Sequence, residues 1–388
     1  MTTTRIPKLA ALALAVRLLA GPNCGFAAEP GDIPMDYNAE MRAAQDAQRK
    51  DPAWKPKYQE IALIQVGKRG KGGSVHNYCL NTNGDILACC GGNFVRVIDE
   101  QQGKSQNVSE PAEIRVISPT GNPVASWPVT KKLQAICVAR DGAIFAAGSG
   151  RIVRLDQNGK EVASAVSPVA DVPVVMGPDI ETMLKQMHQD NDTERRKMKE
   201  QLQRRRADVT GIAVTDKDVF VCVPTPNDFT FRVYRFDHDL KDSKLILEKL
   251  RGCCGQMDIQ AYDGNLWVPH NARHRVECHD RDGKQIAQFG QAGRVKPQQF
   301  GGCCEPKNIR FTSHGDIIAA ESGPPTCLKR FSRDGQFLGV LGMVSGSKGD
   351  CVRVTVEVSP DETRFYMLDT SKDAIHVFGS GELKVSSR

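Results

Sequence analysis

The chain has 388 residues, of which 40% are hydrophobic and 25% are charged. That length suits two ordinary domains or one large repeat array, and the apolar content excludes a wholly disordered chain. The formal net charge of +6 overstates the basicity, because Arg5, Lys8 and Arg17 stand in the first 28 residues, which contain no acidic residue. The remainder is only mildly basic, so no nucleic-acid partner is indicated.

Residues 1–28 have the features of an export signal. A basic start at Arg5 and Lys8 precedes an apolar, helix-prone run over residues 9–20, which small residues follow. The run is shorter than a permanent membrane-spanning helix requires. We therefore expect a signal peptide, a periplasmic or secreted protein, and no permanent membrane span. Because Arg17 interrupts the run, a short anchor or an irregular tail remains the alternative.

A leader segment over residues 29–58, irregular or with short helices, precedes a repeated unit of short strands. Each unit is a run of alternating or β-branched residues broken by Asp-Gly or Asn-Gly, the standard signal of a β-hairpin. The first turns of successive units fall near Gly84, Gly142, Lys217, Gly264, Gly315 and Glu362. The last gaps are roughly forty to fifty residues long, which is the period of a four-stranded β-propeller blade.

The sixth unit, from Val354 to Phe378, supplies only three strands. The stretch over residues 58–70 is similar in sequence to the fourth strands of units four and five. We therefore predict an all-β, six-bladed propeller over residues 59–380, in which residues 59–67 close the ring by completing the last blade. Closure removes exposed strand edges. Residues 381–388 form a tail.

Sequence motifs within the units carry a family resemblance. Asp282-Gly-Lys-Gln-Ile-Ala-Gln-Phe-Gly continues through Gln299-Phe-Gly-Gly to Pro306 and Ile309, and Asn271-Ala-Arg-His-Arg-Val forms a turn into a third strand. These motifs resemble the NHL-repeat family of six-bladed propellers. That family usually places Asp just after the second strand, where this chain has Cys90, Gly148, Val223, His270, Glu321 and Asp369. The resemblance implies a scaffold and assigns no activity, because the scaffold has many uses.

Two insertions interrupt the array. Residues 178–206, between blades two and three, have spaced apolar residues among many charges, which predicts helices. Propeller loops that join one blade to the next open on the same face as the loops between second and third strands. We call this the lid face, and expect the insertion to lie over it as a lid or docking element. In blade one, we place the third strand at residues 95–99 and expect residues 101–121 to enlarge a turn on the opposite face.

Two vicinal cysteine pairs occupy equivalent places in the repeat. Cys253-Cys254 begins blade four and Cys303-Cys304 begins blade five, and alignment puts Cys351 at the second position of such a pair in blade six. These segments lead into the innermost strands, so we expect them at the channel mouth on the lid face. Loops after the second strands bring further side chains to this rim. The predicted binding residues are Cys253, Cys254, Cys303, Cys304, Cys351, His270, Glu321 and Asp369.

Thiolates, an imidazole and carboxylates together suit a metal ion. The candidate metal ligands are Cys90, His270, Cys304, Glu321 and Cys351. Two alternatives remain open, namely disulfides, which an exported protein permits, and inert buried thiols. Cys79 and Cys137 occupy the same first-strand position in blades one and two, so we expect buried packing for them.

The sequence therefore favours a monomeric module that binds an unknown protein or small-molecule ligand through its channel mouth. The alternative is a metal-dependent enzyme, because propellers similar to this one include lactonases and the amidating lyase of peptide maturation, which hold a metal there. No Ser-His-Asp order, phosphate loop or H-E-x-x-H motif identifies a catalytic residue. His270 is the first histidine to test, because it replaces the family's usual Asp.

Overall fold

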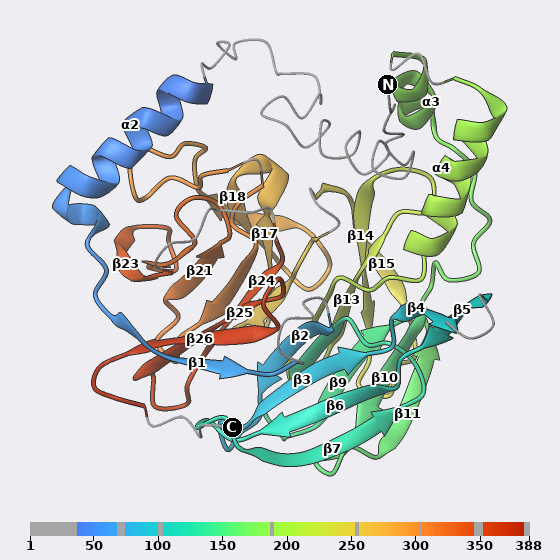
Figure 1. Ribbon diagram of the computed structural model, residues 1–388, viewed down its shortest axis with the longest axis horizontal. Coiled ribbons are helices and arrows are strands. Elements are labelled where there is room, and N and C mark those ends of the chain that lie inside the picture. Colours follow the sequence, from blue (N-terminus) through green and yellow to red (C-terminus); the bar gives the residue numbers. More distant parts are fainter. Residues whose placement is uncertain are drawn as a thin grey trace.

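The computed structural model describes residues 37–67, 74–99, 104–186, 190–252, 256–302, 304–344 and 352–383. Their strands form six four-stranded antiparallel sheets and one two-stranded hairpin (Figure 1). The first strand of each sheet contacts the first strand of the next, and the first strand of the sixth sheet contacts that of the first. These six strands therefore surround a central channel, and the predicted six-bladed propeller is confirmed.

The blades follow one another along the chain. Blade one contains β2 (Val75–Leu80), β3 (Ile86–Gly91), β6 (Ala112–Ile117) and β7 (Pro123–Val129). Blade two contains β8 (Ala135–Val138), β9 (Ile144–Gly148), β10 (Arg151–Leu155) and β11 (Glu161–Val166). Blade three contains β12 (Gly211–Val214), β13 (Val219–Pro224), β14 (Thr230–Phe236) and β15 (Lys244–Arg251).

The second half of the ring repeats this plan. Blade four contains β16 (Gln260–Tyr262), β17 (Asn265–His270), β18 (Arg275–His279) and β19 (Gln285–Phe289). Blade five contains β20 (Asn308–Phe311), β21 (Ile317–Glu321), β22 (Cys327–Phe331) and β23 (Phe337–Met343). Blade six contains β24 (Val354–Val358), β25 (Arg364–Asp369), β26 (Ala374–Gly379) and β1 (Gln59–Gln65).

Burial along a blade explains its sequence pattern. The second strands β3, β9, β13 and β21 are buried at every position and read as continuous apolar runs, because neighbouring blades cover both of their faces. The outermost strands β7 and β11 are mostly exposed. Gly84 and Gly315 adopt φ values of 83° and 88° in the first turns of blades one and five. Only glycine adopts this backbone readily, which is why Asn-Gly and His-Gly punctuate the repeat.

The ring closes as predicted. Strand β1 pairs antiparallel with β26, with Glu60 opposite Phe378 and Ile64 opposite Ile375. Figure 1 shows the blue first strand beside the red last one. The imidazole Nδ1 of His376 lies 2.8 Å from a carboxylate oxygen of Glu60 across this pair. The residues that begin and end the propeller therefore share one blade.

Blade one contradicts the sequence prediction. Its third strand is β6, which pairs with β3, and not residues 95–99. Residues Phe94–Asp99 (β4) and Lys104–Ser109 (β5) form a separate hairpin between the second and third strands. The extra length therefore projects from the lid face and not from the opposite one. The prediction was wrong because β4 has the same alternating, β-branched pattern as a blade strand, and pattern alone does not show which strand it pairs with.

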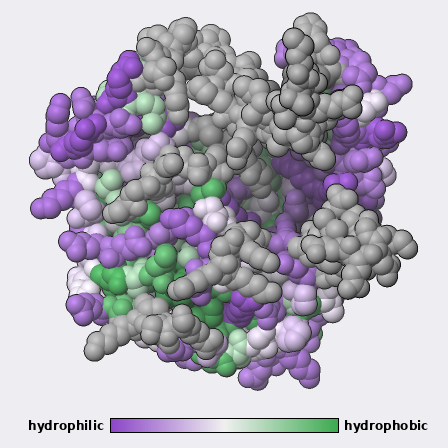
Figure 2. All heavy atoms as spheres, viewed as in Figure 1, coloured by the Kyte–Doolittle hydropathy of each residue, from purple (hydrophilic) through white to green (hydrophobic). Residues whose placement is uncertain are grey.

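The predicted helical insertion is confirmed as α3 (Pro178–Gln186) and α4 (Asp192–Arg205). Their buried residues Ile180, Leu184 and Leu202 form a small apolar cluster with Val174, against which Phe229 of blade three packs. The helix α2 (Tyr37–Lys50) and the 3-10 turn η1 (Pro52–Trp54) precede the propeller. Figure 2 shows mainly hydrophilic side chains over α2 and α4. No helix within the described residues has the length and apolar character that crossing a membrane requires.

Candidate binding site at the channel mouth

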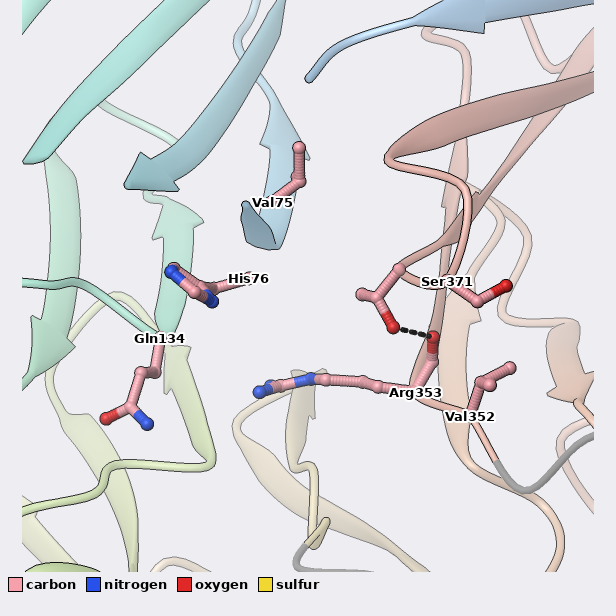
Figure 3. A pocket seen from close by; sticks show the side chains of 7 residues that line it. Val75, His76, Gln134, Val352, Arg353 and Ser371 are labelled. Atoms are coloured by element: carbon pink, nitrogen blue, oxygen red, sulfur yellow. Dashed lines mark hydrogen bonds between the residues drawn. The ribbon is translucent and has the colours of Figure 1, made fainter. Parts of the chain in front are cut away.

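A hollow of about 490 Å³ opens where the innermost strands of blades six, one and two begin. Its side chains come from the first residues of β2, from the residues just before β8 and β24, and from the loop between β25 and β26 (Figure 3). The lining residues are Val75, His76, Gln134, Val352, Arg353, Thr370 and Ser371. The β25–β26 loop joins a second strand to a third, so the hollow lies on the lid face.

Arg353 is the charged side chain of the hollow. It immediately precedes β24, and Figure 3 shows its guanidinium extending across the space toward His76 and Gln134. Nη2 donates to the carbonyl oxygen of Thr210 at 2.8 Å, whereas Nε is buried and has no hydrogen-bond partner among the described residues. Burial lowers the pKa of Arg353, and Asp258 and Asp208 partly offset this effect. The side chain remains a cation at neutral pH.

His76 faces the same space as a neutral group. One of its ring nitrogens, Nε2, lies 2.8 Å from the carbonyl oxygen of Gly91, so Nε2 carries the hydrogen and donates it. Burial, reinforced by the positive charge of Lys132, lowers the pKa of His76 to about 4. In this tautomer Nδ1 is an acceptor. The hollow therefore combines a cationic donor with a neutral imidazole.

Gln134 and Lys132 fix the blade-two side of the site. The Gln134 side-chain amide donates to Asp208 at 2.7 Å and accepts from the backbone N–H of Val209 at 3.2 Å. Lys132 donates to the side chain of Asn93 at 3.0 Å, and burial lowers its pKa. Burial also raises the pKa of Asp208. Two cations, Lys132 and Arg353, therefore lie near the Asp208 carboxylate, which already accepts a hydrogen bond from the Gln134 amide.

Polar side chains fill the channel farther along the innermost strands. Thr355 donates to Asn77 at 3.1 Å, and Asn308 accepts from the backbone N–H of Val356 at 2.8 Å. Arg310 donates to Glu357 at 2.7 Å. These groups satisfy one another across adjacent blades, so this part of the channel is held in one arrangement.

Four of the eight predicted binding residues, Cys253, Cys254, Cys303 and Cys351, lie outside the described residues. Cys304 and Glu321 both lie in blade five. The Cys304 sulfur accepts from the amine of Lys307 at 2.5 Å, and a Glu321 oxygen lies 2.5 Å from the Lys329 amine. The backbone N–H of Gly301 donates to the other Glu321 oxygen at 3.1 Å.

His270 lies at the end of β17, where the repeat placed it, and both of its ring nitrogens are occupied. Nε2 accepts from the backbone N–H of Arg251 at 3.0 Å, so Nδ1 carries the hydrogen that it donates to Glu277 at 2.9 Å. Burial lowers the pKa of His270. Although burial opposes its ionisation, His270, His279 and Arg275 hold the pKa of Glu277 well below its usual range. These bonds orient His270 within its own blade.

Asp369 and Cys90 are likewise engaged within blades six and one. Asp369 accepts from the backbone N–H and the hydroxyl of Ser371 and lies 3.9 Å from His376. The Cys90 thiol is buried, and burial raises its pKa to about 12. Within the described ranges no three His, Cys, Asp or Glu side chains are grouped so that they could hold a metal ion. Of the candidate metal ligands, Cys90, His270, Cys304 and Glu321 lie in blades one, four and five and form no such group, and Cys351 lies outside the described residues.

Several described cysteines carry free thiols. Cys79 and Cys137 lie on β2 and β8, the innermost strands to which the repeat assigned them. Further free thiols are those of Cys89, Cys90, Cys222, Cys278 and Cys327. None of these seven forms a disulfide.

Sequence reasoning identified the lid face and the channel mouth but did not select the residues of the hollow. Val352 and Arg353 directly follow Cys351, and Thr370 and Ser371 directly follow Asp369. One signal was available, because Arg353 is a charged residue immediately before the apolar and β-branched run of an innermost strand. His76 had a weaker signal, since its neighbours give no turn motif.

Comparisons with known proteins support the fold. No protein-family model matches the chain, and no curated protein matches it. The chain is similar to a solved structure of a protein of unknown function from Bacteroides thetaiotaomicron VPI-5482, with a TM-score of 0.51 and 11% identity over 84% of this chain and 75% of that one. A streptogramin B lyase gives a TM-score of 0.44 and 11% identity over 82% and 97% of the two chains. A gluconolactonase from Xanthomonas campestris gives 0.44 and 11% over 81% and 99%. At 11% identity, the likeness to the first of these structures shows the fold alone.

Proposed function

We propose that this six-bladed propeller is a binding module that takes up a small molecule in the hollow at its channel mouth. The observation that carries the proposal is a concave site of about 490 Å³ into which a guanidinium, an imidazole and two valine side chains project. Ligand sites are typically hollows of this size, with mostly apolar walls and a few convergent polar groups.

The surroundings of the hollow support binding because hydrogen bonds between adjacent blades hold the strands next to it in place. Val75 and His76 lie on β2, and the other lining residues directly precede β8 and β24 or lie in the β25–β26 loop. Hydrogen bonds of Thr355 to Asn77 and of Val356 to Asn308 hold the adjoining innermost strands together, and strands position neighbouring side chains more precisely than loops do. The insertion α3–α4 leaves the ring on the same face, between blades two and three.

The proposal includes three features that rest on the sequence. The chain is an NHL-like propeller by its repeat motifs, and it is exported to the periplasm or the exterior by residues 1–28. The third feature is either disulfides at the paired cysteines or a metal ion, with a metal-dependent enzyme as the alternative function. The candidate metal ligands are Cys90, His270, Cys304, Glu321 and Cys351. Binding is the function that the described residues support best, because the hollow itself consists of them.

The test blocks the hollow with one bulky side chain. Ser371 lines it and is exposed, so Ser371→Trp would fill the space with an indole while leaving the core unchanged. Ser313→Trp places the same side chain on an exposed turn of the opposite face and serves as the control. A library of charged and neutral metabolites is screened against the wild type by thermal shift, and hits are titrated by calorimetry.

We expect Ser371→Trp to weaken the hits by tenfold or more and Ser313→Trp to leave them unchanged. Equal melting temperatures of the unliganded variants would show that the fold is intact. Hits that bind both variants as tightly as the wild type would refute the proposed site.

A further inference from the structure

We propose that the ligand of this hollow carries a carboxylate that forms an ion pair with Arg353. This inference rests on the proposed function and names the chemistry of its ligand. It starts from the guanidinium, whose one hydrogen bond in the described structure goes to the carbonyl oxygen of Thr210, while its buried Nε has no partner. An unpaired buried charge costs free energy, and a ligand that pairs with it recovers that cost.

Other arginines of this chain show how a half-buried guanidinium is normally compensated. Arg310 donates to Glu357 at 2.7 Å and lies 3.8 Å from Asp258. Arg235 lies 2.8 Å from Asp282 and 3.7 Å from Asp218. Arg353 has no such carboxylate among the described residues. Arg205, which donates to two carbonyl oxygens, and Arg232, whose buried Nε has no partner, likewise show no carboxylate partner among the described residues, but neither of them lines the hollow as Arg353 does.

The acidic side chains nearest the hollow are committed to other donors. Asp208 accepts from the amide of Gln134 at 2.7 Å. Asp373 accepts from the backbone N–H groups of Ser74 and Val75 at 3.1 Å and 3.0 Å, and Asp369 accepts from Ser371. Lys132 is a second cation near the hollow. Besides burial, its positive charge lowers the pKa of His76, and the positive charge of Arg353 contributes to the lowered pKa of Lys132 itself. A ligand anion in the hollow would therefore lie near two cations, Arg353 and Lys132, while Asp258 and Asp208 also act on Arg353.

The remaining groups favour a monoanionic carboxylate over phosphate. The planar guanidinium fork matches the two oxygens of a carboxylate. The hydroxyl hydrogens of Thr370 and Ser371 are already donated, to the carbonyl oxygen of Arg353 and to Asp369 respectively. His76 is neutral, so one guanidinium is the charged donor that lines the hollow. A phosphate dianion would need more donors than these, whereas Val75 and Val352 suit the short apolar body of a small carboxylic acid.

The experiment compares acids with their uncharged amides. Lactate, butyrate and benzoate are titrated by calorimetry against lactamide, butyramide and benzamide, with inorganic phosphate as a separate arm, up to about 10 mM. Each titration uses the wild type, Arg353→Gln, Arg353→Lys and Arg333→Gln. Arg333 is exposed on the opposite face and pairs with Asp263 at 3.1 Å, so its variant removes the same charge elsewhere.

We expect at least one acid to bind at least tenfold tighter than its amide. Arg353→Gln should weaken that acid by roughly 10- to 100-fold, the loss that removal of a charge-assisted pair produces, and leave the amide unchanged. Arg353→Lys should retain part of the preference, and Arg333→Gln all of it. Melting temperatures within a few degrees of the wild type verify that the variants fold.

Three results would overturn the proposal that the ligand carries a carboxylate paired with Arg353. They are equal binding of an acid and its amide, acid binding that Arg353→Gln does not change, and phosphate binding tighter than that of every acid. Failure of all three acids to bind would overturn it as well. The proposed function fails separately, when no library hit is sensitive to Ser371→Trp. A neutral hit that Ser371→Trp blocks, together with equal acid and amide affinities, would keep the binding module and discard its acidic ligand.

Discussion

Replacing Ile64 with alanine tests how much the closing strand β1 contributes to the free energy of unfolding. The Ile64 side chain is fully buried in β1, opposite Ile375, in an apolar cluster that also contains Tyr78 and Leu368. Replacing it with alanine removes three buried carbon atoms and leaves a cavity between blades six and one. Substitutions of this kind destabilise a protein by about 2–5 kcal/mol, and we expect about 3 kcal/mol here because buried side chains of blades six and one surround Ile64 and restrict relaxation.

The neighbouring residue provides the matched control. Leu63 lies on the same strand but is 46% exposed, so Leu63→Ala should cost less than about 1 kcal/mol. Urea unfolding followed by circular dichroism distinguishes the two variants. We expect Ile64→Ala to lower the midpoint by about 1 M, given the large surface that a chain of this size exposes on unfolding. Equal losses for the two variants, or a greater loss for Leu63→Ala, would refute the register of β1 and with it the closure of the ring.

Three further predictions concern ionisation. Burial alone would lower the pKa of His376, but Asp369 and Glu60 raise it, so the stability it adds is complete at pH 5.5 and is lost as pH rises through the raised value. Glu60→Gln should therefore cost about 1–2 kcal/mol at pH 5.5 and less at pH 9 in urea titrations, and an equal cost at both would contradict this. Burial raises the pKa of Glu305 to about 8, so native Glu305 keeps a proton that the unfolded chain has released. Unfolding free energy should fall between pH 5 and 8 by up to about 1.4 kcal/mol per pH unit, and Glu305→Gln should flatten this slope; an unchanged slope would refute the assignment. Burial also raises the pKa of several fully buried thiols, so iodoacetamide at pH 8 should modify them only after the protein is denatured. Peptide mass spectrometry detects the modification, and rapid labelling of the native protein would contradict their burial. These thiols are Cys89, Cys222 and Cys327.

The architecture was predictable because each blade repeats a local pattern. Turns such as those at Gly84 and Gly315 need a positive φ, and the strands between them alternate with a fixed period. The shortage of one strand in the sixth unit, together with the match over residues 58–70, was sufficient to predict closure. These patterns of turns and strands are visible in the sequence itself, so they can be recognised without knowing which residues are in contact.

The third strand of blade one and the hollow were not predictable in the same way. β4 and β6 have similar strand patterns, and pairing with β3, a non-local interaction, decides which one joins the blade. Likewise His76, Gln134 and Arg353 are separated in sequence and meet only because the ring brings blades six, one and two together. The paired cysteines drew attention to blades four and five, whereas the absence of a counter-ion beside Arg353 becomes visible only in three dimensions.

The pairing of β1 with β26 joins the first and last strands of the propeller, and we call this contact the clasp. Glu60 and His376 are separated by 316 positions, so joining their strands costs about 5 kcal/mol of loop-closure entropy in an otherwise flexible chain. A ribosome finishes β1 long before it makes β26, so the clasp stays open until the last blade has been synthesised. A circular permutant that carries residues 59–67 after β26, joined by a short turn-forming linker, would place both halves of the clasp in one contiguous hairpin and should assemble its last blade faster.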